Sequence, residues 1–423
     1  PLHLRHQLPL RPTHQPPTSR RAPQGAAGMR RYNPPMAYTV LARRYRSRSF
    51  DEVVGQEPIA RTLKNAIETD KVAHAYFFVG TRGVGKTSMA RIFANALNNP
   101  QNDPDIAAAI FTGNDTDTIE IDAASNRKID DARDLIANSV YRPLRGRHKI
   151  YIVDEVHMLT REASNALLKV MEEPPEHVKF ILATTEPHKV LPTIQSRCQR
   201  FDFKNITHAD IVAHLESVLQ QEDINAEREA LTEIARLAEG SMRDALSLLD
   251  RTISAAEGKQ TIDSELLELV LGTPPSALIA ELIDAVARND PRAALETADK
   301  LVARGTDPEQ LLASLAGRFR DLMIVAACGR DSTLLEASDK ARHHAAEQAR
   351  NFDTPALIHL IAQCEAVQQS IRYSATPRAL FDALVARLAM SQHIESAAHL
   401  LAKGEPPPPP TPRDAEKATP GKA

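Results

Sequence analysis

The chain has 423 residues, which is enough for two or three domains with hydrophobic cores of their own. Its 52 basic and 55 acidic residues nearly cancel, so bulk charge does not make it a DNA-binding protein, and any nucleic-acid contact must come from a local patch. Three scattered cysteines, Cys198, Cys328 and Cys364, argue against a disulfide framework or a cysteine zinc site and for a reducing compartment. No apolar run approaches the length of a membrane span, so we expect no membrane partner.

The first 35 residues have the composition of a segment without a core. Residues 1–35 contain eight prolines, six arginines and no acidic residue, and such a segment buries too little apolar surface to fold. We therefore expect a disordered extension over 1–35. We also hypothesise that Met36 is the natural start and that the preceding segment is upstream sequence. Peptides from before Met36 in the mass spectrum of the native protein would contradict this hypothesis.

Strands and helices alternate between residues 36 and 206. Apolar runs predict four strands and helical periodicity predicts helices between them. The expected strands are Tyr76–Val79, Thr118–Asp122, Lys149–Val153 and Lys179–Thr184. The expected helices are 58–69, 86–97, 129–140 and one that carries Leu167, Leu168 and Met171 and ends at Pro174, whereas 98–117 is expected to be loop-like with a short Ala-rich turn. This order predicts a parallel α/β sheet with helices on both faces.

Beyond Phe203 the pattern is helical, and we expect no further strand. Helices are predicted at 209–221, 226–239 and 242–255, and the segment 272–276 (GTPPS) indicates a break between two helical domains. In the second, helix starts are predicted at Asp290-Pro291, Asp307-Pro308 and Thr376-Pro377, and a helix end at Gly305. We interpret its two apolar stripes as core packing: Leu278, Leu282 and Val286, and Leu311, Leu315, Phe319 and Leu322. The domains are therefore 36–206, 207–272 and 273–400, followed by a proline-rich disordered tail over 401–423.

The strongest functional pattern is a glycine-rich turn between a buried strand and a helix. It fits G-x-x-x-x-G-K-[ST], the phosphate-binding loop, over Gly80, Thr81, Arg82, Gly83, Val84, Gly85, Lys86, Thr87 and Ser88. Glycines let backbone N–H groups converge on a phosphate, and Lys86 adds a charge at the β/γ-phosphates. Thr87 offers a hydroxyl to Mg²⁺, and the helix N-terminus favours an anion. The alternative is a strand–helix turn that binds nothing, but the flanking strand and helix favour a nucleoside triphosphate site.

Asp154 and Glu155 follow an apolar strand and match the acidic element of a phosphate-loop ATPase. Asp154 would hold Mg²⁺, mostly through water, and Glu155 would polarise the attacking water. Thr184 and Thr185 end the next strand. If that strand lies between the strand before the phosphate loop and the strand before Asp154, a hydroxyl there reaches the γ-phosphate or the lytic water. A capping role is equally compatible with the sequence.

Two arginines are candidates for neutralising charge on the transferred phosphate. Arg197 stands in QSRCQRF, and a cation with this role is often supplied by a neighbouring subunit. Arg243 opens a predicted helix in GSMRDALSLLD and could close over the same nucleotide. Either arginine would otherwise be an ordinary surface charge, and their spacing does not decide between these roles.

Several blocks together resemble the gamma/tau subunit family of bacterial DNA polymerase III, the ATP-driven motor of the sliding-clamp loader and a member of the AAA+ class. The blocks are VVGQEPI, HAYFFVGTRGVGKTSMARIFA, IEIDAASN, YIVDEVHMLT, NALLKVMEEPPEHVKFILATTEPHKVLPTIQSRCQRF and GSMRDALSLLD. They cover 38–271 densely, and a looser helical similarity continues to about residue 399. The block from EEPPEHVKF to SRC makes the resemblance specific, because generic AAA+ proteins do not share it.

The resemblance implies roles for individual residues and for the domains. Arg197 would be the arginine finger that enters the neighbouring subunit's ATP site, Thr185 the sensor at the end of the strand Lys179–Thr184, and Arg243 the sensor arginine of the lid. The domains would be an AAA+ core (36–206), a helical lid (207–272) and a helical collar (273–400) that holds a five-subunit ring together. Helix starts near Arg127 and Lys128 and near Thr160 and Arg161 would face the ring interior and touch primer–template phosphates; solvated charges are the equally weighted alternative.

The resemblance also implies partners, cofactors and a location. The cofactors would be ATP and Mg²⁺, and the partners would be delta-type and delta-prime-type subunits, the sliding clamp, primer–template DNA and the DNA polymerase III core. The chain would work in the bacterial cytoplasm, in the nucleoid-associated replisome. As an ATPase subunit it would be associated with DNA-directed DNA polymerase activity, a nucleotidyltransferase activity.

Two departures from the family pattern stand out. The family usually carries a four-cysteine zinc module after the first core helix, but 98–117 has no cysteine, so we expect no zinc. The long form of the family adds polymerase- and helicase-binding domains after the collar, whereas here a proline-rich tail follows, which suggests the short form or a truncation.

We therefore expect ATP binding to order a ring that opens a sliding clamp, and primer–template DNA to trigger hydrolysis that releases the clamp on DNA. The chain alone should hydrolyse ATP slowly, because its finger acts in trans. One rival is an AAA+ branch-migration helicase, which would need a C-terminal winged-helix domain with strands. Another is a non-catalytic ring scaffold, which is expected to lack a working phosphate loop.

Overall fold

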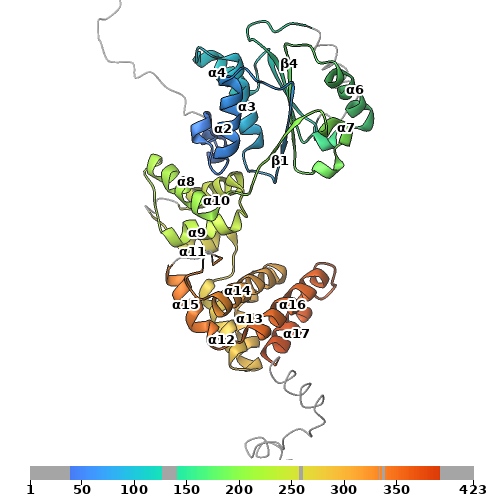
Figure 1. Ribbon diagram of the computed structural model, residues 1–423. Coiled ribbons are helices and arrows are strands. Elements are labelled where there is room, and N and C mark those ends of the chain that lie inside the picture. The colour runs from blue at the N-terminus through green and yellow to red at the C-terminus, as the bar shows by residue number, and fades with distance from the viewer. Residues whose placement is uncertain (1–38, 126–140, 257–260, 333, 336–338, 391–423) are drawn as a thin grey trace, which may run out of the picture. The chain divides into compact units, whose positions relative to one another are not determined.

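The first part of the chain is built around a five-stranded sheet in which every strand pairs in parallel (Figure 1). The computed structural model describes residues 39–125, 141–256, 261–332, 334–335 and 339–390. The strand order is β2-β3-β4-β1-β5. The strands are β1 (Ala75–Val79), β2 (Thr118–Asp122), β3 (Lys149–Asp154), β4 (Val178–Thr184) and β5 (Gln199–Asp202).

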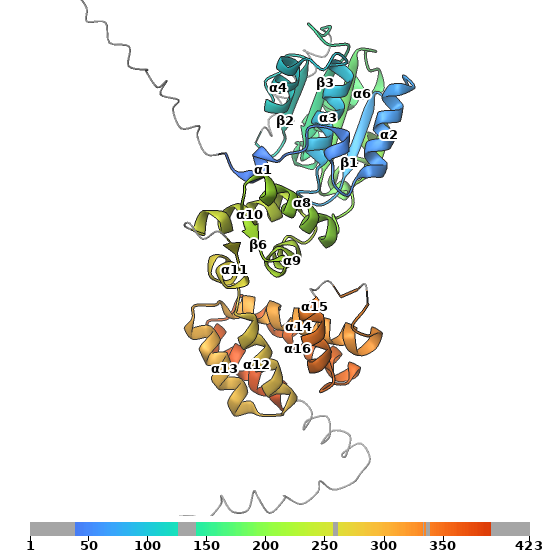
Figure 2. The same cartoon turned by 90° about the vertical axis from the view of Figure 1, so that its left-hand side faces the viewer.

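Helices cover both faces of this sheet, as the sequence predicts. They are α2 (Glu57–Glu68), α3 (Lys86–Asn98), α4 (Pro104–Thr112), α6 (Arg161–Glu172) and α7 (Pro192–Gln195), with single 3₁₀ turns η1 (Phe50–Glu52), η2 (Val156–Met158) and η3 (Pro187–Lys189). The short helix α1 (Leu41–Arg44) precedes them in the chain and packs away from the sheet. Tyr76 and Phe78 of β1 belong to the cluster that contains α2 and α3, whereas Phe77 packs with α6. Figure 2 shows α3 lying across one face of the sheet. Because alternate residues serve opposite faces, a strand buried on both faces is a continuous apolar run.

Two expectations for this region are wrong. The segment 98–117 is not a loop: it contains α4, which begins at Pro104 with the Asp103 side chain accepting the N–H groups of Asp105 and Ile106. The sequence analysis also missed β5, whose residues QRFD lie at the sheet edge and are mostly exposed. An edge strand needs no apolar run, so hydrophobic periodicity does not detect it. The helix expected at 129–140 lies outside the described residues.

The second part is helical and has its own core. It contains α8 (His208–Gln221), α9 (Arg228–Leu237), α10 (Met242–Ala255) and α11 (Ser264–Leu271). The expectation of no strand beyond Phe203 is wrong in one detail, because β6 (Asn225–Ala226) and β7 (Thr261–Ile262) pair in parallel. Two-residue strands are too short to produce a periodic pattern. Leu41 of α1 packs into this helical core and its N–H group bonds to Asp250.

The third part is a set of helices around a single large core. They are α12 (Ser276–Ala287), α13 (Pro291–Ala303), α14 (Pro308–Cys328), α15 (Asp339–Ala349), α16 (Thr354–Ile371) and α17 (Pro377–Ala389). The predicted starts are confirmed: Asp290 and Asp307 cap α13 and α14 through their side chains, and α17 begins at Pro377. The predicted stripes lie in this core, with Leu278 partly buried at its margin.

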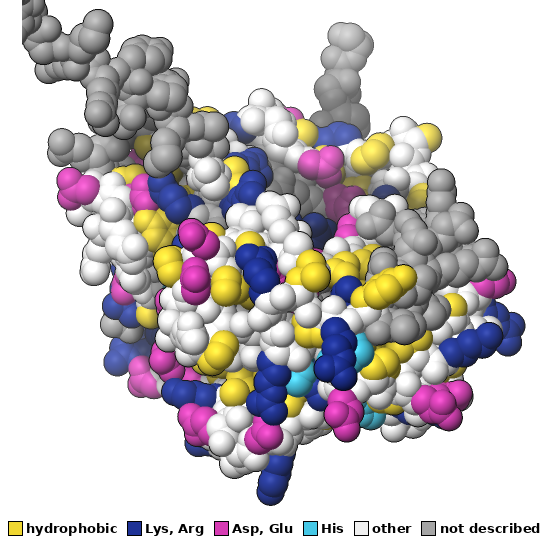
Figure 3. All heavy atoms as spheres, turned by 90° about the horizontal axis from the view of Figure 1, so that it is seen from above, with side chains coloured by type: hydrophobic (Ala, Val, Ile, Leu, Met, Phe, Trp, Pro, Cys, Tyr) yellow, Lys and Arg dark blue, Asp and Glu magenta, His cyan; other side chains and the backbone are white. Residues whose placement is uncertain are grey.

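Charges of both signs are mixed on the face shown in Figure 3, where Lys and Arg side chains are interspersed with Asp and Glu. Among the described residues, no helix is by itself long and apolar enough to cross a membrane, and one pair, α11 with α12, meets those criteria together across a bend of 87°.

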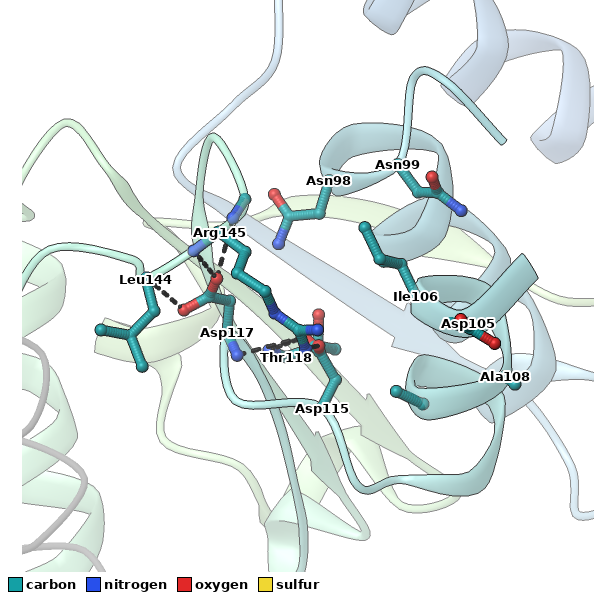
Figure 4. Close-up of polar contacts among 12 residues, drawn as sticks. Asn98, Asn99, Asp105, Ile106, Ala108, Asp115, Asp117, Thr118, Leu144 and Arg145 are labelled. Atoms are coloured by element: carbon teal, nitrogen blue, oxygen red, sulfur yellow. Dashed lines mark hydrogen bonds and ion pairs between the residues drawn. The ribbon is translucent and has the colours of Figure 1, made fainter. Parts of the chain in front are cut away.

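A buried carboxylate fixes the loop that precedes β3 (Figure 4). The Asp117 carboxylate, on a residue only 2% exposed, accepts the backbone N–H groups of Leu144, Arg145 and Gly146 at 2.7, 2.7 and 2.8 Å. Asp115 pairs with Arg145 at 2.8 Å and accepts the N–H group of Asp117. Burial by itself raises the pKa of Asp117, but the three N–H groups outweigh it and hold the pKa below its ordinary value.

We expect Asp117→Asn to lower the free energy of unfolding of the sheet domain by about 2 kcal/mol, because it weakens three charge-assisted bonds. Hydrogen exchange measured by mass spectrometry should show lost protection over 141–148. Because the pKa of Asp117 is depressed in the folded state, its stabilisation is complete above the ordinary pKa and is lost as the pH falls through the folded value. The difference between the two proteins should therefore be constant above about pH 5 and shrink in acid. Asp105→Asn, at an exposed residue in α4, is the control, and equal exchange in both variants would contradict the role of Asp117.

Candidate nucleotide-binding site

A sharp turn joins the end of β1 to the start of α3, and it contains the predicted phosphate loop. The strand ends at Val79 and the helix begins at Lys86, as predicted. Gly83 and Gly85 have φ values of 80° and 100°, in the left-handed region that favours glycine. Val84 is buried beneath the loop, whereas Thr81 and Arg82 are exposed. The loop therefore presents backbone rather than side chains at its glycine positions.

The Lys86 side chain folds back over the loop. Lys86 is 6% exposed, and its ammonium donates to the carbonyl oxygens of Gly80 and Thr81 at 2.9 and 2.8 Å. Burial lowers the pKa of Lys86, and the charges of Glu155 and Asp154 act against that shift. The hydrogen bonds to two carbonyl oxygens and the nearby carboxylates compensate for the burial of this ammonium and direct it at the loop.

Parallel pairing brings the acidic pair to the phosphate loop. β4 lies between β3 and β1, so the ends of all three strands meet at one edge of the sheet. At that edge the Thr87 hydroxyl, in the first turn of α3, donates to Asp154 Oδ2 at 2.5 Å. Asp154 Oδ1 accepts the N–H group of Glu155, whose φ of 48° is uncommon outside glycine. The loop and the end of β3 thus form a single polar site.

The two threonines at the end of β4 have different surroundings. Thr184 is fully buried, and its hydroxyl contacts His157 Nδ1 at 2.9 Å and accepts the N–H group of Glu186 at 3.0 Å. Thr185 donates to Glu155 Oε2 through its N–H group at 3.3 Å and its hydroxyl at 3.1 Å. β4 lies between β3 and β1, which is the strand order that a hydroxyl near the γ-phosphate requires. Of the two threonines, Thr185 is the one that bonds to the acidic pair.

The start of α10 lies directly against the phosphate loop. A Cβ atom on Gly83 would fall 1.9 Å from Ser241 Oγ and 3.3 Å from the Arg243 Cβ atom, so only a hydrogen atom fits there. Thr81 also donates to Asn205 Oδ1 at 2.6 Å. The structure therefore brings Arg243 beside the loop, as a residue that closes over the nucleotide requires.

Arg46 is a site residue that the sequence analysis missed. Its Nε atom donates to the Ser88 hydroxyl at 2.8 Å. Burial lowers the pKa of Arg46 to about 10, and the nearby charges of Arg91 and Arg243 add to that shift. The available signal was the basic run of Arg43, Arg44, Arg46 and Arg48, but nothing in its spacing connects Arg46 to Ser88, which lies 42 residues later.

Arg197 lies away from this loop. It precedes β5, whose first residue, Gln199, pairs with Tyr76 near the start of β1, whereas the phosphate loop follows the end of β1. Its guanidinium bonds to the Thr193 carbonyl at 2.9 Å and to Glu172, the last residue of α6, at 3.0 Å. Arg197 therefore lies on the side of the sheet where the strands begin.

The residues predicted to contact DNA stay predictions. Thr160 caps α6 by accepting the N–H group of Ala163 at 3.2 Å, and Arg161 is exposed at the first position of that helix. Arg127 and Lys128 lie outside the described residues.

The site offers oxygen ligands for a hard divalent cation. The Thr87 hydroxyl and the Asp154 carboxylate are adjacent, and Mg²⁺ prefers such oxygen donors. Over the described ranges, no group of three or more His, Cys, Asp or Glu side chains is arranged to hold a metal ion. In the segment 98–117, where the family's cysteine module would stand, the structure has α4.

The strand order, the phosphate loop after β1 and the acidic pair after β3 define an AAA+ phosphate-loop nucleotide-binding core. Three family models match in succession: the DNA polymerase III delta subunit over 55–207, the clamp loader subunit ATPase lid domain over 210–258, and domain III of the gamma and tau subunits over 262–403. The chain is 40% identical over 372 residues to the DNA polymerase III subunit tau of Bacillus subtilis and 43% identical over 312 residues to that of Escherichia coli. The chain belongs to the gamma/tau subunit family of bacterial DNA polymerase III.

These alignments cover 86% and 71% of this chain, but only 65% of the Bacillus protein and 48% of the Escherichia protein. The chain thus spans about half to two thirds of the length of these relatives. Among solved structures, the Thermotoga maritima RuvB Holliday junction branch migration motor aligns at 19% identity and a TM-score of 0.43, over 57% of this chain and 79% of that one. The Bacillus subtilis clamp loader delta protein aligns at 15% identity and a TM-score of 0.36, over 78% of this chain and 99% of that one.

We expect Lys86→Ala to abolish nucleotide binding, because it removes the buried positive charge of the phosphate loop. The other basic residue of the motif, Arg82, is exposed. The loss should be at least about 100-fold in the dissociation constant of a fluorescent ATP analogue, or about 2.7 kcal/mol. Lys64→Ala, at an exposed position in α2, is the matched control. Equal affinity in the two variants would show that the loop is not the binding site.

Proposed function

We propose that this chain is an ATP-driven motor subunit of a bacterial clamp loader, which hydrolyses ATP to load the sliding clamp onto primer–template DNA during replication. The observation that carries the proposal is the joined site: a phosphate loop whose Thr87 bonds to Asp154 and whose neighbouring acid, Glu155, bonds to Thr185. An inactive scaffold subunit has no use for this arrangement. The family, whose matched models include a clamp loader lid, supplies the biological setting.

ATP binding is an exchange at Lys86. The ammonium leaves the carbonyl oxygens of Gly80 and Thr81 and bonds to the β- and γ-phosphates, while the loop N–H groups and the start of α3 cradle the anion. Thr87 and Asp154 would hold Mg²⁺, which when bound neutralises phosphate charge. Arg243 and Arg46 add positive charge next to the loop.

Hydrolysis requires a group that orients water. Glu155 stands after β3 next to Asp154, and it accepts the proton or polarises the water that attacks the γ-phosphate. Thr185 acts as the sensor, because its hydroxyl bonds to the same carboxylate and can report the presence of the γ-phosphate to β4. This division of labour leaves Thr184 with a buried structural role.

Arg197 is proposed to act in the site of a neighbouring subunit. Gly80 lies four residues further along the strand direction than Tyr76, the partner of Gln199, a separation of roughly 13 Å. Arg197 precedes Gln199, so it is further still from the phosphate loop of its own chain. An arginine at the opposite side of the sheet, with 35% of its side chain exposed, suits contact in trans, and the isolated chain should therefore turn over slowly.

The proposed organisation has a core (36–206), a lid (207–272) and a collar (273–400). Four sets of buried residues support it, since the sheet has two apolar clusters, the helices α8–α11 have one and the helices α12–α17 have one. The proposed partners are delta-type and delta-prime-type subunits in a five-subunit ring, the sliding clamp, primer–template DNA and the polymerase III core, in the bacterial cytoplasm. Thr160 and Arg161 remain candidates for DNA contact.

The test is ATP turnover by the chain assembled with delta-type and delta-prime-type subunits. Primed DNA together with the clamp should stimulate turnover at least about tenfold over either component alone, and linear duplex without the clamp should not. Stimulation by duplex alone would instead support a branch-migration motor, and absence of any turnover with intact ATP binding would support a scaffold.

We expect Arg197→Ala to keep ATP affinity within about twofold but to reduce the stimulated turnover of the assembly by about 10³-fold, because transition-state charge on the phosphate loses its cation. Arg200→Ala is the control, since Arg200 is exposed on β5 and pairs with Asp202. Unimpaired stimulated turnover in the Arg197 variant would disprove the assignment.

A further inference from the structure

His157 is a buried histidine that no role proposed above uses. It lies in η2, directly after the acidic pair, and its side chain is only 6% exposed. The ring reaches from the end of β3 to the end of β4. Its Nδ1 atom is 2.9 Å from Thr184 Oγ1 and 3.4 Å from Glu155 Oε2, and its Nε2 atom is 3.9 Å from Glu186 Oε1.

The contacts of His157 favour a proton on Nδ1, the ring nitrogen that faces both Thr184 and Glu155. Glu155 Oε2 is an acceptor, and a bare Nδ1 lone pair 3.4 Å away would repel it. Thr184 Oγ1 already accepts the N–H group of Glu186, and it can also accept from the ring. A proton on Nδ1 satisfies both neighbours, in the neutral ring or in the imidazolium.

Three groups therefore converge on one oxygen of Glu155, two of them through hydrogen bonds and the third at ion-pair distance. They are the N–H group of Thr185 at 3.3 Å, the Thr185 hydroxyl at 3.1 Å and His157 Nδ1 at 3.4 Å. His157 and Thr185 reach this oxygen from different elements. His157 also contacts Thr184, the residue before Thr185, so both groups are connected to the end of β4. Glu155 itself has the left-handed backbone conformation, with a φ of 48°, which is uncommon for a residue other than glycine and clusters at functional sites.

We propose that His157 is a positioning residue that holds the Glu155 carboxylate in one orientation and ties it to the end of β4. With Oε2 anchored, rotation of the carboxylate is arrested, and the attacking water meets a base of fixed direction. The inference rests on the proposed ATPase function for its consequence, because it assigns His157 a part in the step that Glu155 performs. Its geometric content, a proton on Nδ1 shared by Thr184 and Glu155, does not depend on that function.

Three variants separate positioning from packing. His157→Asn places its amide nitrogen where Nδ1 stands, His157→Gln places it near Nε2, and His157→Ala has no donor. In the assembled clamp loader with primed DNA and clamp, at saturating ATP, the Ala and Gln variants should lose about tenfold to 100-fold in kcat. The Asn variant should stay within about threefold of the unsubstituted protein. The dissociation constant for a fluorescent ATP analogue should change less than about twofold in all three.

His188→Ala is the matched control, because His188 is a neighbouring histidine whose side chain is 74% exposed. Thermal unfolding of each full-length variant shows whether the fold is kept. Normal kcat in the folded Ala variant, or a loss in the Asn variant equal to that in the Ala variant, would overturn the role of His157.

A second measurement is independent of turnover. In the full chain labelled with ¹⁵N-histidine, the His157 signal, assigned by its disappearance in the Asn variant, should show a protonated Nδ1 at neutral pH. An unprotonated Nδ1 would refute the inference whatever the kinetics show. If the unsubstituted assembly binds no ATP or hydrolyses none, the proposed function fails, while the nitrogen spectrum still decides the position of the proton.

Discussion

The site depends above all on the parallel pairing of β3, β4 and β1. In a parallel sheet the carboxyl ends of neighbouring strands lie at the same edge, and ligands bind in the crevice beyond that edge. Here the edge collects Lys86 and Thr87 after β1, Asp154 and Glu155 after β3, and Thr185 after β4. Three different strand ends contribute these residues, so a shift of register between any two of the strands would separate the phosphate loop from the acids that complete it.

Hydrogen bonds then convert neighbouring positions into a connected site. Thr87 links the loop to Asp154, the backbone of Glu155 bonds to Asp154, and Thr185 and His157 meet at Glu155. Such chains of polar contacts in a partly buried setting are stronger than the same contacts in water, and they fix side-chain orientation. Ser241 and Arg243 extend the connection to α10, because Gly83 leaves no space between the loop and that helix.

The sequence was most informative where one local pattern has one physical solution. The glycine loop, the apolar runs of β1 and β3 and the proline caps of α13 and α14 all fix local conformation, and these predictions are confirmed. It failed at β5 and at β6 and β7, because an edge strand and two-residue strands need no apolar periodicity. It also missed Arg46 and His157, since their roles come from tertiary contacts with Ser88 and with Thr184. The part proposed for Arg197 requires a neighbouring subunit, because within its own chain the guanidinium bonds to Thr193 and Glu172 instead of the phosphate loop.

The two carbonyl contacts of Lys86 have a consequence for ligand selection. An incoming ligand must replace both contacts at the ammonium, so only the surplus of the new interaction over the old one contributes to affinity. A nucleoside or a monophosphate brings too few anionic oxygens to compete with two carbonyl dipoles and a buried setting. We therefore expect the loop to favour nucleotides with two or more phosphate groups over monophosphates and nucleosides, through the phosphate chain and without any contact to base or sugar.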